Sequence, residues 1–372
     1  MFNIPVSCSE QNPAIRIARE RGLLSQIMET TIKKKEITGI SFSRVVLIVL
    51  IVFIHFLGSS GRKFSIFPYY LYPPWNSLLA VDFLMISGAV LYYNHPEVPS
   101  LKKFYFKRFK SIYVPFYLAY AYFFIRQVFQ LGDLFPHGQP WCLIFTVLGI
   151  DGYAATKFPS YNLIGEWSLG VIVILYFLFP LLAKCIRRAP WLTALVILAG
   201  YFIMLKTMFL TTFASRNIFT CLMSFYFGML VIKYENIFLR HPLIGLGSLL
   251  FLILSGNVFY LPVDACTLTQ LHGFAFFFVL YYIGDFAMKY MPVRKIISCL
   301  SPLSYPLFLV HHIIVNETVG YQNPETPGLF LLVFLIALLL SLAAAKVLSL
   351  VTGAVVKSDA WKKLENRILG RA

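Results

Sequence analysis

Apolar stretches separated by short polar segments run through most of the chain. About ten of them are long enough to cross a bilayer some 30 Å thick, because an α-helix rises about 1.5 Å per residue. We expect these helices to begin near Ser43, Asn76, Ser111, Trp167, Trp191, Arg216, Leu243, Leu271, Cys299 and Leu329. The pattern predicts an all-α fold, a polytopic membrane bundle of about ten transmembrane helices.

One apolar stretch, Trp141–Ile150, is too short to cross a bilayer comfortably. Counting it as a span would flip every later segment and would abolish the difference in basic residues between the two sides of the membrane. We therefore interpret residues 131–165 as an outer region that contains one re-entrant or interfacial segment. Such a segment is tolerated only where other protein covers its backbone.

The composition excludes a soluble globular protein. Of 372 residues, 59% are hydrophobic and only 13% are charged, so the chain has more apolar surface than a core of its own can bury. Membrane lipid is therefore an expected partner. The six cysteines stand singly, without the spacing of a metal site or a disulfide framework, and we expect no metal.

A formal net charge of +16 would suit a nucleic-acid-binding protein, but its distribution argues against nucleic acid as a partner. If the N-terminus is cytoplasmic, the outer side holds only Arg62, Lys63, Arg126, Lys157, Lys206 and Arg216. This asymmetry predicts that both termini are cytoplasmic. The expected organisation is a basic N-terminal tail (residues 1–42), a membrane domain (43–356) and a basic C-terminal tail (357–372).

Arg44 and His55 are separated by ten uncharged residues on the first predicted span. Eleven steps of about 100° and 1.5 Å make roughly three turns, so both side chains face the same way about 16 Å apart. Ionisable groups at membrane depth usually mark a functional site. The alternative is that Arg44 only sets the topology and that His55 makes an interhelical contact.

Three other ionisable residues, Asp82, His311 and His312, are expected at a depth similar to that of His55. A carboxylate beside a histidine fixes its tautomer and raises its basicity, which suits a general base. Alternatively, Asp82 is a neutral carboxyl bonded to a neighbouring helix. The two adjacent histidines point about 100° apart, so we expect only one of them to face a given site.

A basic cluster precedes the third predicted span, near Arg44 in topology. It comprises Lys102, Lys103, Lys107, Arg108 and Lys110. The positive-inside rule explains most of these charges. A sharper hypothesis is an anion clamp for a phosphorylated ligand. Because the distance from Arg44 to His55 is comparable to an extended pantetheine arm, a coenzyme A nucleotide held at the inner edge would bring its thioester to His55.

Five blocks of the sequence resemble the type 3 membrane acyltransferase family, whose members mostly O-acylate cell-surface glycans and lipids. The blocks are Arg44 with His55, Val81–Gly88, Phe104–Pro115, Glu166–Pro180 and Leu303–His311. They follow in the family's order over about residues 43–356. The resemblance implies a ten-helix bundle, an acyl-CoA donor and carried-over roles for Arg44 and His55.

The resemblance also frames the remaining expected site residues. Asp82 or His311 would orient His55, Tyr305 or Ser304 would donate to the oxyanion, and Arg44, Lys107, Arg108 and Lys110 would bind the donor. Glu166 and Trp167 are expected at the acceptor. This chain departs from the family where a second basic residue is common, at Ser111, and where a glutamate is common, at Ile172. It leaves no room for an extra hydrolase-like domain, so we expect the stand-alone form.

We expect an O-acetyltransferase of a bacterial inner membrane that moves an acetyl group from cytoplasmic acetyl-CoA to a hydroxyl of a cell-surface or exported polysaccharide. The alternative from another class is a transporter or flippase of a glycan, a lipid or a small acid. Transporters tend to show matching broken helices in two halves, whereas here the polar residues gather in the first, second and ninth predicted spans. The sequence is compatible with a homo-oligomer but does not determine one.

Overall fold

The chain divides into two compact units, Met1–Ile37 and Thr38–Ala372. The structure, a computed structural model, describes residues 37–61, 75–135, 139–164, 167–207, 213–255, 258–259, 261–322, 324 and 326–370. Most of the expected N-terminal tail, and Glu166, lie outside these residues. The second unit is the one that carries the site.

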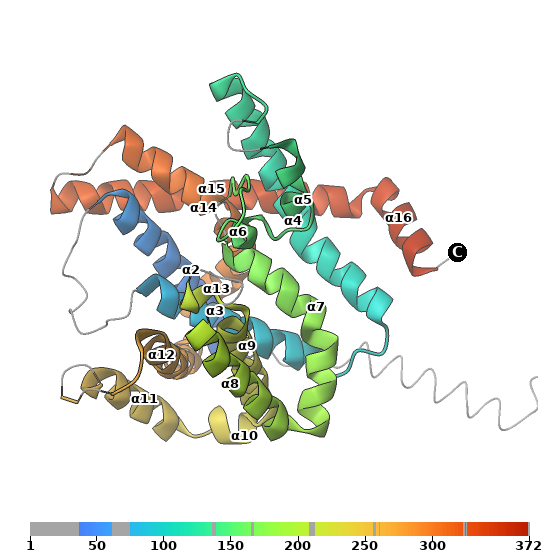
Figure 1. The fold of residues 1–372 in the computed structure, drawn as a ribbon. Coiled ribbons are helices and arrows are strands. Elements are labelled where there is room, and N and C mark those ends of the chain that lie inside the picture. The colour runs from blue at the N-terminus through green and yellow to red at the C-terminus, as the bar shows by residue number, and fades with distance from the viewer. Residues whose placement is uncertain are drawn as a thin grey trace, which may run out of the picture. The chain divides into compact units, whose positions relative to one another are not determined.

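The described residues form helices throughout, without a strand (Figure 1). In chain order they are α2 (Thr38–Ser59), α3 (Trp75–Asn94), α4 (Leu101–Leu131), η1 (Pro140–Cys142), α5 (Leu143–Val147), α6 (Asp151–Ala154), α7 (Trp167–Arg188), α8 (Pro190–Thr207), η2 (Ala214–Arg216), α9 (Ile218–Lys233), α10 (Glu235–Phe238), α11 (Pro242–Leu254), α12 (Ala265–Ala287), α13 (Met291–Leu300), η3 (Ser301–Leu303), α14 (Ser304–Tyr321), α15 (Pro327–Lys357) and α16 (Asp359–Leu369).

Seven helical segments among the described residues are long and apolar enough to cross a membrane. They are Thr38–Ser59, Ser77–Asn94, Trp167–Arg188, Pro190–Thr207, Ala265–Ala287, Met291–Tyr321 and Pro327–Lys357. The protein is therefore a polytopic helical membrane protein. Three more expected spans correspond to α4, which carries many charges, and to α9 and α11, which have only 16 and 13 residues.

Helix α4 begins ten residues before the predicted start at Ser111. The side chain of Ser100 caps the helix by accepting a hydrogen bond from the backbone N–H of Lys103 (3.3 Å). The basic cluster is therefore the first part of α4 and not a loop, since Lys and Arg are good helix formers. Gly132 ends the helix in the left-handed conformation, at φ 68°.

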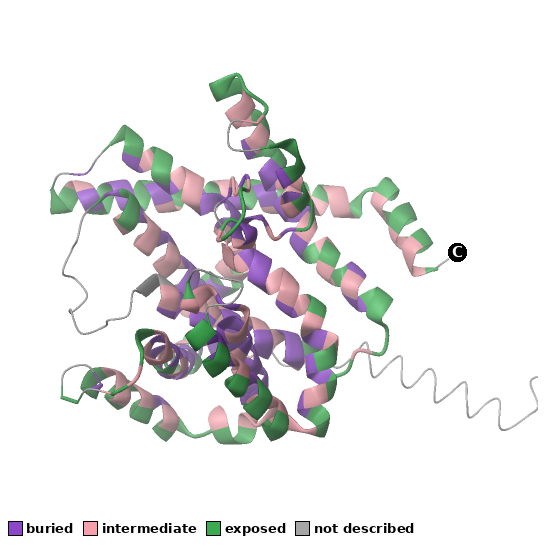
Figure 2. Cartoon of the chain, viewed as in Figure 1, coloured by how far each residue is buried: buried purple, intermediate pink, exposed green. Residues whose placement is uncertain are grey.

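Exposed apolar side chains cover the outward faces of many helices, as Figure 2 shows by the alternation of buried and exposed turns. Examples are Phe129, Leu243 and Leu339, which are 85%, 76% and 65% exposed. A soluble protein would leave such a surface in water at high cost. Such an apolar surface is expected on a protein that spans a membrane, where lipid covers it.

Residues 139–164 form three short helical pieces, η1, α5 and α6, that pack against α4 and α7. The hydroxyl groups of Tyr113 and Tyr117 donate to the backbone carbonyls of Leu148 (2.7 Å) and Val147 (2.5 Å). Gly170 of α7 lies so close to this segment that an added Cβ would sit 2.7 Å from Tyr153. Side chains from α4 thus satisfy carbonyls of the segment, as a re-entrant segment requires.

Candidate active site

One large cavity of about 1240 Å³ runs between helices α2, α3, α4, α7 and α14. Its volume is larger than the range typical of small-molecule sites, about 300–1,000 Å³. The segment 139–164 and the residues around η2 complete the wall. There is therefore room for a long ligand or for two substrates.

The cavity has two distinct ends. Tyr305 of α14 contacts Ile112 of α4, and further along both helices Glu317 pairs with Arg126, so α4 and α14 run in the same direction. Helix α7 runs against them, because Phe179 stacks on Phe104 near the start of α4. Arg44 and Arg108 therefore lie at one end of the cavity, which we call the Arg44 end. The start of α7 and the last turns of α2 and α14 lie at the other, the Arg216 end.

Arginines are the only charged side chains among the described residues that line the cavity, apart from the titratable histidines His55 and His312. They are Arg44, Arg108 and Arg216. Since no aspartate or glutamate lines the described wall, the potential inside favours anions.

The structure places Arg44 and His55 in the wall of this one cavity. Both come from α2, where the first turns hold Arg44 and the last turns hold His55. The helical rise separates their Cα atoms by about 16 Å along the axis. A ligand lying along α2 therefore contacts a guanidinium at one end and an imidazole near the other.

The ring of His55 lies against two other histidine rings, with centroids 5.1 Å away for His311 and 4.9 Å for His312. Nδ1 of His311 lies 2.9 Å from the carbonyl of Phe308 and 3.2 Å from that of Leu307. A carbonyl only accepts, so Nδ1 carries the proton and Nε2 of the neutral ring holds the lone pair. His311 is fully buried and does not line the cavity.

The ring of His312 does line the cavity, and its hydrogen bonds indicate the opposite tautomer. The hydroxyl of Ser59 donates to Oδ1 of Asn316 (2.5 Å), and Nδ2 of Asn316 donates to Nδ1 of His312 (3.4 Å). The proton of a neutral His312 ring therefore sits on Nε2. His55 is thus flanked by one ring that accepts at Nε2 and one that donates there.

Asp82 does not join this histidine group. It is fully buried, lies outside the cavity wall, and neither carboxyl oxygen has a hydrogen-bond partner among the described residues. Ala80, Phe83 and Ser87 form the cavity side of α3, and a step of about 100° per residue turns Asp82 away from it. The expectation that Asp82 orients His55 is therefore corrected: histidine rings are the neighbours of that imidazole.

Of the basic residues of α4 that were expected to bind an anion, only one lines the cavity. Arg108 lines the cavity, with its guanidinium carbon 5.8 Å from the ring centre of Phe104 and 6.0 Å from that of Tyr176. Lys107 and Lys110 lie on other faces of the same helix and do not line the cavity. Their expected part in donor binding is not supported by this geometry.

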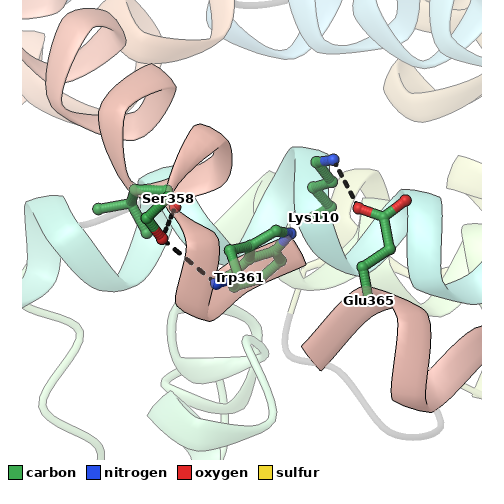
Figure 3. Close-up of polar contacts among 5 residues, drawn as sticks. Lys110, Ser358, Trp361 and Glu365 are labelled. Carbon is green, nitrogen blue, oxygen red and sulfur yellow. Dashed lines mark hydrogen bonds and ion pairs between the residues drawn. The ribbon is translucent and has the colours of Figure 1, made fainter. Parts of the chain in front are cut away.

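Lys110 instead pairs with the C-terminal helix. Its ammonium group lies 3.0 Å from a carboxylate oxygen of Glu365 on α16 (Figure 3). Ser358 caps that helix by accepting a hydrogen bond from the backbone N–H of Trp361 (3.2 Å). The indole of Trp361 packs beside Phe106 of α4. Most of the expected C-terminal tail therefore forms a helix, α16, that packs against α4.

Tyr305 lines the cavity, but its hydroxyl donates to the backbone carbonyl of Ile112 (2.9 Å). It also precedes His311 by six residues, about 9 Å along the helix. The hydroxyl is therefore already engaged, and it lies nearer the Arg44 end than the histidines do. Ser304 also lines the cavity and has no hydrogen-bond partner for its hydroxyl among the described residues.

At the Arg216 end, Trp167 lines the cavity as expected for an acceptor residue, and Arg216 lies over its ring at 5.3 Å. Partial burial lowers the pKa of the Arg216 guanidinium from its usual value, although an arginine stays charged in proteins. From the sequence, Arg216 was identified only as one of the few basic residues on the outer side of the membrane. Its place in the cavity follows from the contact between the starts of α7 and α9, which no local pattern reveals.

Chemically, the cavity combines cations at both ends with an imidazole cluster between apolar helices. Among the residues that the structure describes, no group of three or more His, Cys, Asp or Glu side chains is arranged to hold a metal ion. A neutral imidazole in such a place takes or returns a proton. Fixed guanidinium groups bind phosphate or carboxylate with forked hydrogen bonds.

A family model described as an acyltransferase domain matches residues 37–346, which include every helix that lines the cavity. No curated protein and no solved structure matches the chain.

Proposed function

Because the chain belongs to the type 3 family of membrane O-acyltransferases and is therefore an acyltransferase, we propose that it moves an acetyl group from acetyl-CoA to a hydroxyl of a cell-surface or exported polysaccharide. The observation that carries this proposal is the continuous cavity with arginines at one end and the histidine group toward the other. Donor and acceptor enter from opposite ends and meet at His55.

The donor enters at the Arg44 end. Arg44 and Arg108 hold phosphate groups of coenzyme A, for which forked guanidinium groups are better suited than lysines. The pantetheine arm lies along α2 and spans the roughly 16 Å to His55. The acetyl thioester is thereby held next to the imidazole.

The acceptor hydroxyl attacks the thioester carbonyl while His55 takes its proton. The C–S bond then breaks, and the coenzyme A thiolate leaves and receives that proton from His55. The products are the O-acetyl ester and free coenzyme A. His55 needs an unprotonated ring nitrogen for this step, which the neutral form of an imidazole provides.

In the membrane we propose ten spans, made of the seven long apolar segments with α4, α9 and α11. Both termini and the Arg44 end face the cytoplasm, where acetyl-CoA is made, and the Arg216 end faces outward. The asymmetry of basic residues supports this orientation. The membrane we propose is the bacterial inner membrane, because that is where exported polysaccharides are assembled.

Two variants of α2 separate donor binding from chemistry. Arg44→Lys keeps a charge but loses the forked geometry, and Arg44→Ala loses both, so coenzyme A affinity should fall in the order wild type, Lys, Ala. His55→Ala should still bind coenzyme A but lose about 10²- to 10⁴-fold in thioester turnover. Binding is measured by calorimetry on protein purified in detergent, and turnover by release of free thiol from acetyl-CoA, with water as surrogate acceptor.

Each outcome decides between explanations. If wild-type protein neither binds coenzyme A nor releases thiol, the proposed donor is wrong, and transport of a glycan or lipid becomes the better explanation. If Arg44→Ala binds coenzyme A as tightly as wild type, the phosphate contact is wrong. Near-normal turnover by a well-folded His55→Ala protein contradicts the role of the imidazole.

A further inference from the structure

Arg216 is held between two aromatic rings at the end of the cavity opposite Arg44. Its guanidinium carbon lies 4.7 Å from the ring centre of Phe213 and 5.3 Å from that of Trp167. Such cation–π contacts restrain the side chain while leaving its charge in place. The two rings come from different segments, the start of α7 and the turn before α9, so the packing of the bundle holds Arg216 in position.

The guanidinium has no carboxylate within ion-pairing distance among the described residues, and none lines the described wall of the cavity. Neither ring accepts a conventional hydrogen bond from its five N–H donors. With no counter-ion among the residues that the structure describes, this half-buried charge is costly unless water or a ligand solvates it. A ligand with a negative group therefore gains from binding here.

Polar, uncharged side chains line the same cavity as Arg216. They include Ser77, Thr156, Asn162, Ser168 and Ser215, of which Ser168 follows Trp167 and Ser215 precedes Arg216 in the sequence. Hydroxyl and amide groups of this kind form hydrogen bonds with sugar hydroxyls. The arrangement combines one fixed cation with several neutral hydrogen-bonding groups, which matches a glycan that carries an acidic group.

We propose that Arg216 selects an acceptor bearing an oxyanion, either the carboxylate of an acidic sugar or the phosphate of a lipid-linked sugar, and holds it so that a neighbouring hydroxyl reaches His55. This inference rests on the proposed function, since it names the acceptor class of that same cavity. Trp167 and Phe213 act as positioning residues, because they hold the guanidinium and leave its N–H groups for the anion.

The test uses the full chain in nanodiscs of neutral lipid, so that no lipid headgroup supplies net negative charge. Binding of three probes is measured with saturating free coenzyme A, so that the Arg44 end is occupied: methyl β-glucuronide, the neutral methyl β-glucoside, and geranyl diphosphate. Each is titrated against wild type, Arg216→Gln, Arg216→Lys and Lys206→Gln. Lys206 is the matched control, because it is an exposed cation at the end of α8, near the same end of the bundle, and does not line the cavity.

Wild type should bind at least one anionic probe about tenfold more tightly than the glucoside, since hydrogen bonds to charged groups are worth about that factor or more. Arg216→Gln should remove this preference, Arg216→Lys should keep part of it, and Lys206→Gln should leave it unchanged. Preference for the glucuronide identifies an acidic sugar, and preference for geranyl diphosphate identifies a lipid-linked phosphate.

Three results would overturn the proposal. One is equal binding of charged and neutral probes to wild type, and another is an unchanged preference in Arg216→Gln. The third is a loss of coenzyme A affinity in Arg216→Gln as large as that in Arg44→Ala, which would make Arg216 a donor contact. Retained coenzyme A binding by Arg216→Gln shows that the variant is folded. Failure of the proposed donor chemistry would appear instead in the coenzyme A experiments, which need no acceptor.

Discussion

Hydrogen bonds to the two neighbours of His55 decide which nitrogen of each ring carries the proton. His311 donates from Nδ1 to carbonyls of its own helix, whereas His312 accepts at Nδ1 from Asn316. Because adjacent helical residues point about 100° apart, only His312 reaches the cavity. Asn316 in turn is held by Ser59 of α2. The side chain of Asn316 thus links the orientation of His312 to the helix that carries His55.

Replacing Asn316 tests whether this link matters for chemistry. Asn316→Leu removes the donor to His312 Nδ1 and frees the ring to adopt the other tautomer, so thioester turnover should fall about threefold to tenfold with unchanged coenzyme A affinity. Thr318→Val is the control on the same helix, because Thr318 bonds to the backbone carbonyl of Ile314 and does not line the cavity. Equal turnover in both variants would mean that the link to Asn316 is structural only.

Helices α3 and α9 approach each other so closely that only glycine fits at the crossing. A Cβ added at Gly88 would lie 2.0 Å from the backbone oxygen of Phe225, and one added at Gly228 would lie 2.0 Å from that of Met85. Small residues at such crossings allow backbones to pack in a membrane, where no hydrophobic force drives helices together. This contact fixes α3, whose other face forms part of the cavity wall.

Filling this crossing should destabilise the bundle. Gly88→Ala and Gly228→Ala each force two backbones apart, and overpacking of this kind costs about 1–3 kcal/mol. The midpoint of thermal unfolding in detergent, followed by circular dichroism, should therefore drop for both variants. Gly247→Ala is the matched control, since this helical glycine has open space around its would-be Cβ and alanine favours helix. If all three variants unfold like wild type, the close approach of α3 and α9 does not limit stability.

Across the whole molecule, the distribution of charge gives the two ends of the cavity different surroundings. With the N-terminus inside, most lysines and arginines fall on the cytoplasmic side and few on the outer side. Arg44 and Arg108, the proposed donor contacts, lie at the end with the basic start of α4. Arg216 stands at the other end with few cations near it. The proposed division between a cytoplasmic donor and an outer acceptor follows from this arrangement.

Cysteine labelling of intact cells measures this orientation directly. In a cysteine-free background, an impermeant maleimide should label Lys157→Cys from outside, but should label Arg240→Cys and Lys295→Cys only after the membrane is opened. All three positions are exposed in the structure, so access is set by the side of the membrane. Labelling of Arg240→Cys in intact cells would contradict both the ten-span topology and the proposed entry of the donor from the cytoplasm.

The sequence by itself determined the class of fold, the family and the shared face of Arg44 and His55. Runs of apolar residues predict membrane helices because lipid offers no partner to polar groups, and the helical repeat brings residues eleven apart onto one side. These are local properties, so a linear pattern contains them. The sequence did not predict where α4 begins. Its first residues are basic, and basic residues beside an apolar stretch were interpreted as a loop.

Only the tertiary structure decided which residues from different helices meet. Depth along the chain suggested Asp82 beside His55, but the rotation of α3 turns Asp82 away, and α14 supplies His311 and His312 instead. In the same way, the packing of η2 against α7 brings Arg216 over Trp167. Rotation about a helix axis and the pairing of distant helices depend on how all the side chains pack together, and no single stretch of sequence records them.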